Sequence, residues 1–138
     1  MEYGISVRMT VPFPEAVRRV REALAAQGFG VLTEIDVRAT LHEKLGEDME
    51  DYLILGACNP PLAHRALAAD RKVGLLLPCN VVIRTGPGET IIEAQDPQIM
   101  AEVAGQATLR TVAAEAAARI RAALAAIAEA GPPGVPAA

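Results

Sequence analysis

Two cysteines, each followed by an asparagine and close to a proline, are the residues of this chain best suited to chemistry. Cys58 lies in the segment GACNP (56–60) and Cys79 in the segment LPCN (77–80), each at or near the end of an apolar run. Side chains held at strand ends are where sheets often carry functional groups. The chain has no further cysteine.

Cys58 precedes a predicted helix, and its position there gives the physical case for a reactive thiol. Unpaired N–H groups and the helix dipole favour an anion at a helix N-terminus, which lowers a thiol pKa. Cys58 would then be a catalytic nucleophile or redox centre, with Cys79 resolving or orienting it. The alternative is that both are small buried residues at strand ends, as free cysteines commonly are.

The distance between the two thiols depends on strand direction. Parallel strands on either side of the helix at 59–69 would bring Cys58 and Cys79 to one end of the sheet, whereas antiparallel strands would place them far apart. A disulfide needs Cα atoms within about 7 Å, and the expected compartment is reducing. We therefore favour free thiols.

Other polar side chains could join a site, each with a simpler alternative. Glu34 and Asp36 point to one side of a predicted strand, as a carboxylate pair or as its solvated face. Asn80 lies inside an apolar strand and needs a ligand or a backbone partner, and Asn59 could bind a ligand or cap a helix. His42 could act as a base.

No metal site or cofactor is predicted. His64 is expected to face solvent, and the cysteines and histidines match no recognised ligand spacing. The chain also shows no cofactor fingerprint.

Hydrophobic periodicity predicts the elements that hold these residues. Alternation indicates strands at 3–11 and 29–38, and a stripe at three- and four-residue spacing indicates a helix from Pro14 to Gly28. The remaining predicted elements are a short helix at 40–45, strands at 52–57 and 73–82, a helix at 59–69, a hairpin of 81–84 with 90–94, and helices at 96–105 and 108–128.

This order predicts an α+β fold, a mostly antiparallel sheet packed against helices that include a long C-terminal helix. Residues 1–130 are expected to form a single domain, and the proline-rich segment 131–138 a flexible tail. The strands at 52–57 and 73–82 are apolar on both faces, so both faces need cover. If helices cover one face, a second subunit could cover the other, and we expect a homodimer.

Composition excludes several functional classes. The 138 residues carry a net charge of −4 and only four aromatic side chains, which argues against a nucleic-acid partner. The N-terminus lacks the features of a signal peptide, and the longest apolar run is too short to span a bilayer. We expect a cytoplasmic protein with no membrane partner.

Several of these segments together resemble the prokaryotic family known as domain of unknown function 302. The resemblance rests on GFGVLTEID (28–36), Leu45-Gly46, the two cysteine segments and Asp96-Pro97, and it covers about residues 7–100. It implies a fold similar to that of the TATA-binding protein, with a curved sheet against helices, a dimer, and a ligand pocket between the sheet and the long helix. It implies no activity.

Three functions remain open at this point. The first is a binding or regulatory module, acting as a dimer, whose small-molecule ligand contacts Asn59, Asn80 and Cys79. The second is a thiol-dependent enzyme or redox protein using Cys58 and Cys79, and the third a structural dimer that binds another protein. Whether the protein is an enzyme is left open.

Overall fold

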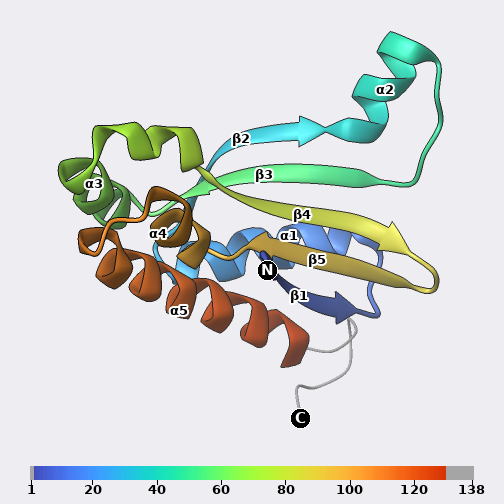
Figure 1. Ribbon diagram of the computed structural model, residues 1–138. Coiled ribbons are helices and arrows are strands. Elements are labelled where there is room, and N and C mark those ends of the chain that lie inside the picture. The colour runs from blue at the N-terminus through green and yellow to red at the C-terminus, as the bar shows by residue number, and fades with distance from the viewer. Residues whose placement is uncertain (1, 130–138) are drawn as a thin grey trace.

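One antiparallel sheet of five strands organises the fold, and its strand order is β1-β5-β4-β3-β2 (Figure 1). The computed structural model describes residues 2–129. The strands are β1 (Gly4–Met9), β2 (Gly30–Asp36), β3 (Tyr52–Cys58), β4 (Cys79–Gly86) and β5 (Glu89–Gln95). The helices are α1 (Phe13–Ala26), α2 (Val37–Leu45), α3 (Pro60–Ala69), the 3₁₀ helix η1 (Arg71–Leu76), α4 (Gln98–Ala104) and α5 (Thr108–Glu129). The predicted α+β class is therefore confirmed, including the long C-terminal helix.

Helices α1 and α5 cover one face of the sheet. The buried residues of α1 follow its 3.6-residue period, and Pro14 stands in its first turn, where its missing N–H costs nothing. They pack with α5 and with alternate strand residues into the main core, which includes Leu24, Leu55, Ile83, Ile92, Ile120 and Leu124. No helix of residues 2–129 covers the opposite face of the sheet, which we call the open face.

A second, smaller hydrophobic cluster lies at one end of the sheet. It joins α3, η1, α4 and the first half of α5 through Leu62, Ala66, Val73, Met100, Leu109, Val112 and Ala113. The cluster forms because the chain leaves β3 and re-enters the sheet at β4 through two consecutive helical segments. Its junction with the main core is where the pocket described below lies.

The prediction of a strand over 73–82 is wrong in its first half. Residues 71–76 form η1, in which Asp70 caps the turn by accepting a hydrogen bond from the Lys72 N–H at 3.0 Å. Val73 is buried in the smaller cluster while Leu75 is exposed. A short apolar run does not by itself distinguish a strand from a buried helical turn, and β4 begins only at Cys79.

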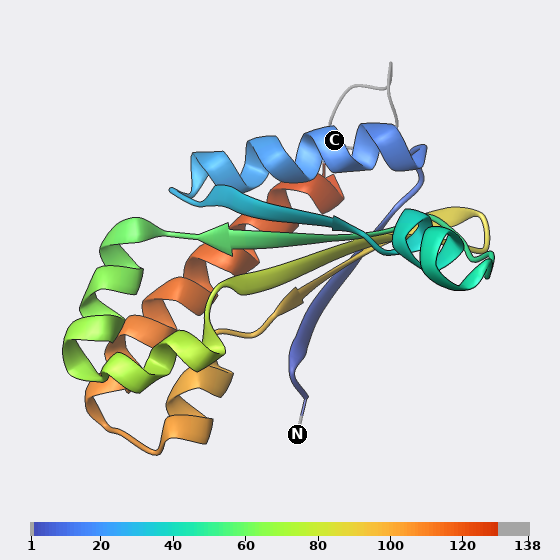
Figure 2. The same cartoon turned by 90° about the horizontal axis from the view of Figure 1, so that it is seen from above.

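The strand predicted at 29–38 is interrupted by a bulge and ends earlier. The register of β2 against β3 shifts between Val31 and Thr33, so residues on either side of the bulge exchange faces. Val37, expected in the strand, begins α2 instead, because Asp36 caps that helix by accepting from the Ala39 N–H at 2.9 Å. Helix α2 stands beyond the end of β2, away from the other helices (Figure 2).

The remaining predicted elements match the structure within a few residues at their ends. The predicted tail at 131–138 and the domain boundary at residue 130 lie outside the described residues. No helix within residues 2–129 is long and apolar enough to cross a membrane.

Candidate functional site

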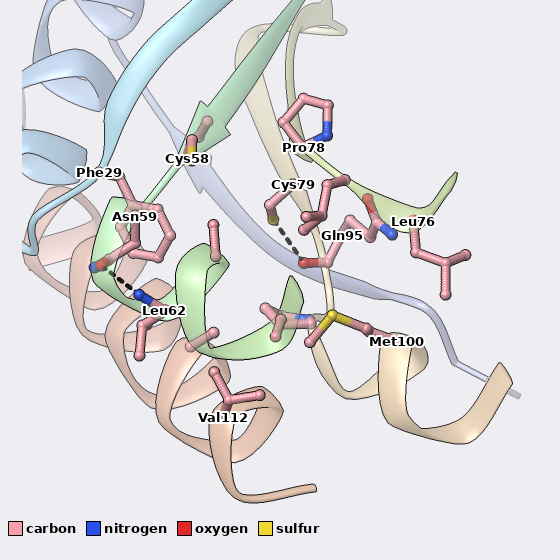
Figure 3. A pocket seen from close by; sticks show the side chains of 16 residues that line it. Phe29, Cys58, Asn59, Leu62, Leu76, Pro78, Cys79, Gln95, Met100 and Val112 are labelled. Atoms are coloured by element: carbon pink, nitrogen blue, oxygen red, sulfur yellow. Dashed lines mark hydrogen bonds between the residues drawn. The ribbon is translucent and has the colours of Figure 1, made fainter. Parts of the chain in front are cut away.

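An apolar pocket of about 60 Å³ lies where β3 ends and β4 begins (Figure 3). It is bordered by the strand ends, by α3, and by α4 and α5, at the junction of the two hydrophobic clusters, and is partly open to solvent. Its lining consists of Phe29, Ala57, Cys58, Asn59, Leu62, Ala63, Ala66, Leu76, Leu77, Pro78, Cys79, Gln95, Pro97, Met100, Val112 and Ala116. Both cysteines of the chain thus line one pocket, which the sequence did not predict.

The two cysteines are neighbours although their strands are antiparallel. Our expectation that antiparallel strands would separate the thiols was wrong, because it assumed a strand that begins at 73. With β4 beginning at Cys79, the first residue of β4 pairs with Ala57, one residue before Cys58. Consecutive strand residues point to opposite faces, so the two side chains leave the backbone in different directions. Both are free thiols.

The Cys79 thiol is held in its neutral form. Its Sγ donates a hydrogen bond to the backbone carbonyl of Gln95 at 3.3 Å. Burial raises the pKa of Cys79 to about 12, and the nearby Asp96 carboxylate adds to this increase. A thiol that is both buried and engaged as a donor is a weak nucleophile at neutral pH, because the thiolate is the reactive species.

The helix that follows Cys58 offers few donors to a thiolate. Pro60 and Pro61 occupy its first two positions and have no N–H group. The next amide, that of Leu62, donates to the Asn59 Oδ1 at 3.4 Å, and the Ala63 amide donates to the Asn59 carbonyl. The unpaired N–H groups on which the case for an activated Cys58 rested are therefore missing or already bonded.

Asn59 has a structural role as the N-cap of α3. Besides accepting from Leu62, its Nδ2 donates to the backbone carbonyl of Gln27 at 3.2 Å and so ties α3 to the end of α1. Arg119 on α5 donates to the same carbonyl at 3.3 Å. The side chain is buried, and these bonds use one of its two N–H donors and one acceptor position of its oxygen.

The other predicted site residues do not gather at this pocket. Asn80 is exposed on the open face, where its backbone N–H donates to the Gln95 Oε1 at 3.4 Å. Glu34 and Asp36 share one side of β2, as predicted, but at the other end of the sheet. There Glu34 pairs with Arg21 and Asp36 caps α2.

His42 also lies away from the pocket. It sits on α2, 3.1 Å from Asp48, and His64 is exposed on α3. Within residues 2–129 no group of three or more His, Cys, Asp or Glu side chains is placed to hold a metal ion.

Sequence reasoning missed two polar or polarisable members of the pocket, Gln95 and Met100. Gln95 ends β5 and Met100 lies on α4, whereas both cysteines belong to other elements. Gln95 could have been recognised from the sequence as a candidate, because it is a polar residue at the end of a predicted strand. In the sequence Met100 is an ordinary apolar helix position, and only the packing of α4 against α5 and η1 brings it to the pocket.

Comparison with known proteins places the chain in a family. The model of the family described as domain of unknown function DUF302 matches residues 5–127. Among solved structures, the chain is similar to the crystal structure of an uncharacterised conserved DUF302 protein from Bacillus stearothermophilus. The two are 32% identical, with a TM-score of 0.85 over 91% of this chain and 98% of the other. No curated protein matches the chain. Residues 5–127, which include both cysteine segments, identify this chain as a member of the DUF302 family.

Proposed function

We propose that this protein is a binding or regulatory module that takes a small uncharged molecule in the pocket beside Cys79 and acts as a homodimer. The observation that carries the binding proposal is the pocket lining, in which apolar side chains surround two thiols and two amides. None of the lining residues is charged.

The lining selects the charge of the ligand. An ion moved from water into apolar surroundings without a counter-charge costs many kcal/mol, and the pocket supplies no such counter-charge. The polar atoms at the wall are partly committed, since the Cys79 thiol and the Asn59 amide already have partners. A neutral molecule with at most one or two hydrogen-bonding groups fits this chemistry best.

The cavity also bounds the ligand in size. An engineered cavity of about 150 Å³ in another protein holds benzene, and this one is less than half that volume. The part of a ligand that lies within this volume is therefore limited to a few non-hydrogen atoms, and any further part would extend through the open side of the pocket. With a ceiling of about −1.5 kcal/mol per atom, four atoms within the pocket contribute about −6 kcal/mol, which corresponds to a dissociation constant of roughly 4 × 10⁻⁵ M.

Thiol chemistry is the second candidate, and the geometry favours it less. It would need a thiolate at Cys58 or Cys79. Burial holds Cys79 protonated, and the prolines at the start of α3 leave few donors near Cys58. Both residues support the binding proposal instead, as polarisable parts of an apolar wall.

The homodimer is supported by the composition of β3. Its residues are apolar on both faces, yet the helices of the described part of the chain cover only one of these faces. A third possibility is a structural dimer with no ligand. The composition of β3 supports it equally, and it differs from the first proposal only in that the pocket binds nothing.

The experiment that tests ligand binding uses three probes of similar shape: 1-propanol, propionate and propylammonium. We expect propanol to shift the methyl NMR signals of Ala63, Ala66 and Ala116 in a saturable way, and the two ions to leave them unchanged. Ala63→Leu, which fills the pocket, should abolish the shifts. Ala68→Leu is the matched control, because Ala68 is exposed on the same helix and outside the pocket lining.

Equal shifts from all three probes, or shifts that survive Ala63→Leu, would show that the pocket does not bind as proposed. Saturable binding of propionate alone would contradict the charge argument directly. A fast reaction of either thiol with an electrophile at neutral pH would favour the thiol candidate.

A further inference from the structure

The open face of the sheet presents an apolar row across three strands. Ile35 on β2 pairs with Ile54 on β3, and Ile54 pairs with Val82 on β4. These positions alternate with the residues of the main core, so their side chains point away from α1 and α5. Ile35 is 48% exposed at the edge strand. No other element of the described chain covers this row.

Helix α2 lies at the end of this face and is only partly covered, since Val37 and Leu41 are half-buried against β2 and β3. It has nine residues, and none of them is buried. Isolated helices shorter than about 12–15 residues are marginal in water, even with the caps that Asp36 and Gly46 provide here. Val37, Leu41 and Leu45 recur every four residues along one stripe, and Leu45 is 69% exposed. Such a stripe needs an apolar neighbour.

The charges of the open face are balanced. Its strand residues include two arginines and two glutamates, which form the pairs Arg8–Glu89 and Arg84–Glu93, the latter at 2.7 Å. The whole chain, in contrast, has a net charge of −4. Two copies of an acidic surface repel each other, whereas two copies of this neutral face can meet without net repulsion. The charge pattern therefore suits a second copy of the chain.

The size of the surface also suits a dimer. Strands of six to eight residues at ~3.3 Å per residue, five across at ~4.8 Å, give a face of roughly 550 Å². Helix α2, at ~1.5 Å per residue and ~10 Å across, adds about 135 Å². A stable interface buries about 800 Å² of accessible surface per partner, and a corrugated face has more accessible surface than this flat projection. The face also contains a hollow of about 830 Å³, lined partly by Tyr52, Asn80, Val82 and Glu93, into which a partner can protrude.

We propose that the open face, together with α2, is the surface through which two copies of this chain associate. The inference rests on the homodimer of the proposed function and specifies its interface. The row Ile35–Ile54–Val82 of one copy packs on the partner's open face, and the stripe of α2 becomes covered in the same association. The pocket lies at the other end of the sheet from α2, so both copies keep their pockets.

The test combines light scattering with substitutions on two apolar surfaces. Ile35→Glu and Leu45→Glu each place a charge in the proposed interface. Leu75→Glu and Val103→Glu are matched controls, because these residues are 78% and 62% exposed on the wall of a separate hollow between η1 and α4. We expect the wild type to weigh twice its 14.5 kDa at about 50 μM. Each interface variant should raise the dimer dissociation constant at least tenfold, which corresponds to about 1.4 kcal/mol.

Circular dichroism verifies folding, and Leu45→Glu keeps the test decisive if Ile35→Glu does not fold, since Leu45 is mostly exposed. A monomeric wild type would overturn both the interface and the homodimer while leaving the ligand test unaffected. A wild-type dimer that survives both interface variants, or dissociates with the controls, would overturn the interface alone. A monomer that instead binds a different protein through Leu45 would also overturn it.

Discussion

Raising the pH should destabilise this protein through one buried thiol, Cys79. Its pKa in the folded state is about 12, against an ordinary value of 9.0. The folded state therefore retains the thiol proton where the unfolded chain loses it. The resulting stabilisation is fully present below pH 9 and is lost as the pH rises from 9 toward 12.

The magnitude follows from the two pKa values. Each unit of pKa difference corresponds to about 1.36 kcal/mol. Deprotonation of Cys79 in the unfolded chain should lower the free energy of unfolding by about 1.4 kcal/mol at pH 10 and by about 2.7 kcal/mol at pH 11, relative to pH 7. Other groups titrate in this range too, so the wild type alone does not isolate the effect.

The assay is therefore a comparison of urea unfolding curves for the wild type and Cys79→Ala at pH 7, 9, 10 and 11, under reducing conditions. Cys79→Ala carries a constant loss from the missing side chain and lacks the titration. The difference between the two free energies of unfolding should shrink by the amounts above as the pH rises. Cys58→Ala is the control for a second thiol in the same pocket. Parallel pH profiles for the wild type and Cys79→Ala would refute the conclusion that Cys79 is held as a neutral thiol.

Three further predictions concern single residues. Cys79 should react with iodoacetamide at pH 8 roughly 10³-fold more slowly than a free thiol of the ordinary pKa of 9.0, because its thiolate fraction is lower by that factor. Alkylation followed by mass spectrometry measures this rate, and a rate equal to that of the unfolded chain would contradict the prediction. Asn59→Ala should cost about 1–2 kcal/mol in urea unfolding because a buried helix cap is lost, whereas Asn80→Ala should cost less than about 0.5 kcal/mol; equal costs would show that the cap is unimportant. Gly56→Ala should cost about 1–3 kcal/mol, because the added Cβ would collide with the Thr33 hydroxyl and approach Pro78 Cγ to 2.9 Å. Gly30→Ala, with no atom within 4 Å of its Cβ, should be nearly neutral in the same assay.

Much of the fold could be predicted from local patterns. The period of α1, the N-cap at Asn59, the turn between β4 and β5, and the stripe of α5 each depend on residues close together in the sequence, and each is confirmed. The prediction of a strand around Val73 was wrong because the apolar pattern there fits both a strand and a buried helical turn. The bulge in β2 was not predicted, because an alternating pattern does not show where the pairing with β3 slips by one residue.

The candidate site was only partly predictable. The two cysteine segments, singled out from the sequence, both line the pocket. Three other candidates had suitable chemistry but lie away from the pocket. Glu34 pairs with Arg21, Asp36 caps the start of α2, and His42 contacts Asp48. Polar residue type alone does not say whether a side chain faces a pocket or already has a partner.

The α+β class, the family resemblance and the residues that cap and end most helices could be predicted from the sequence, because these depend on short-range periodicity and turn chemistry. Three features depend on the packing of distant elements: Cys58 and Cys79 line the same pocket, Gln95 and Met100 complete its lining, and the Cys79 thiol stays protonated. Each of these depends on where β4 begins and on how α4 and α5 close over the strand ends. Both depend on contacts between residues far apart in the sequence, and the burial that these contacts produce raises the pKa of the Cys79 thiol.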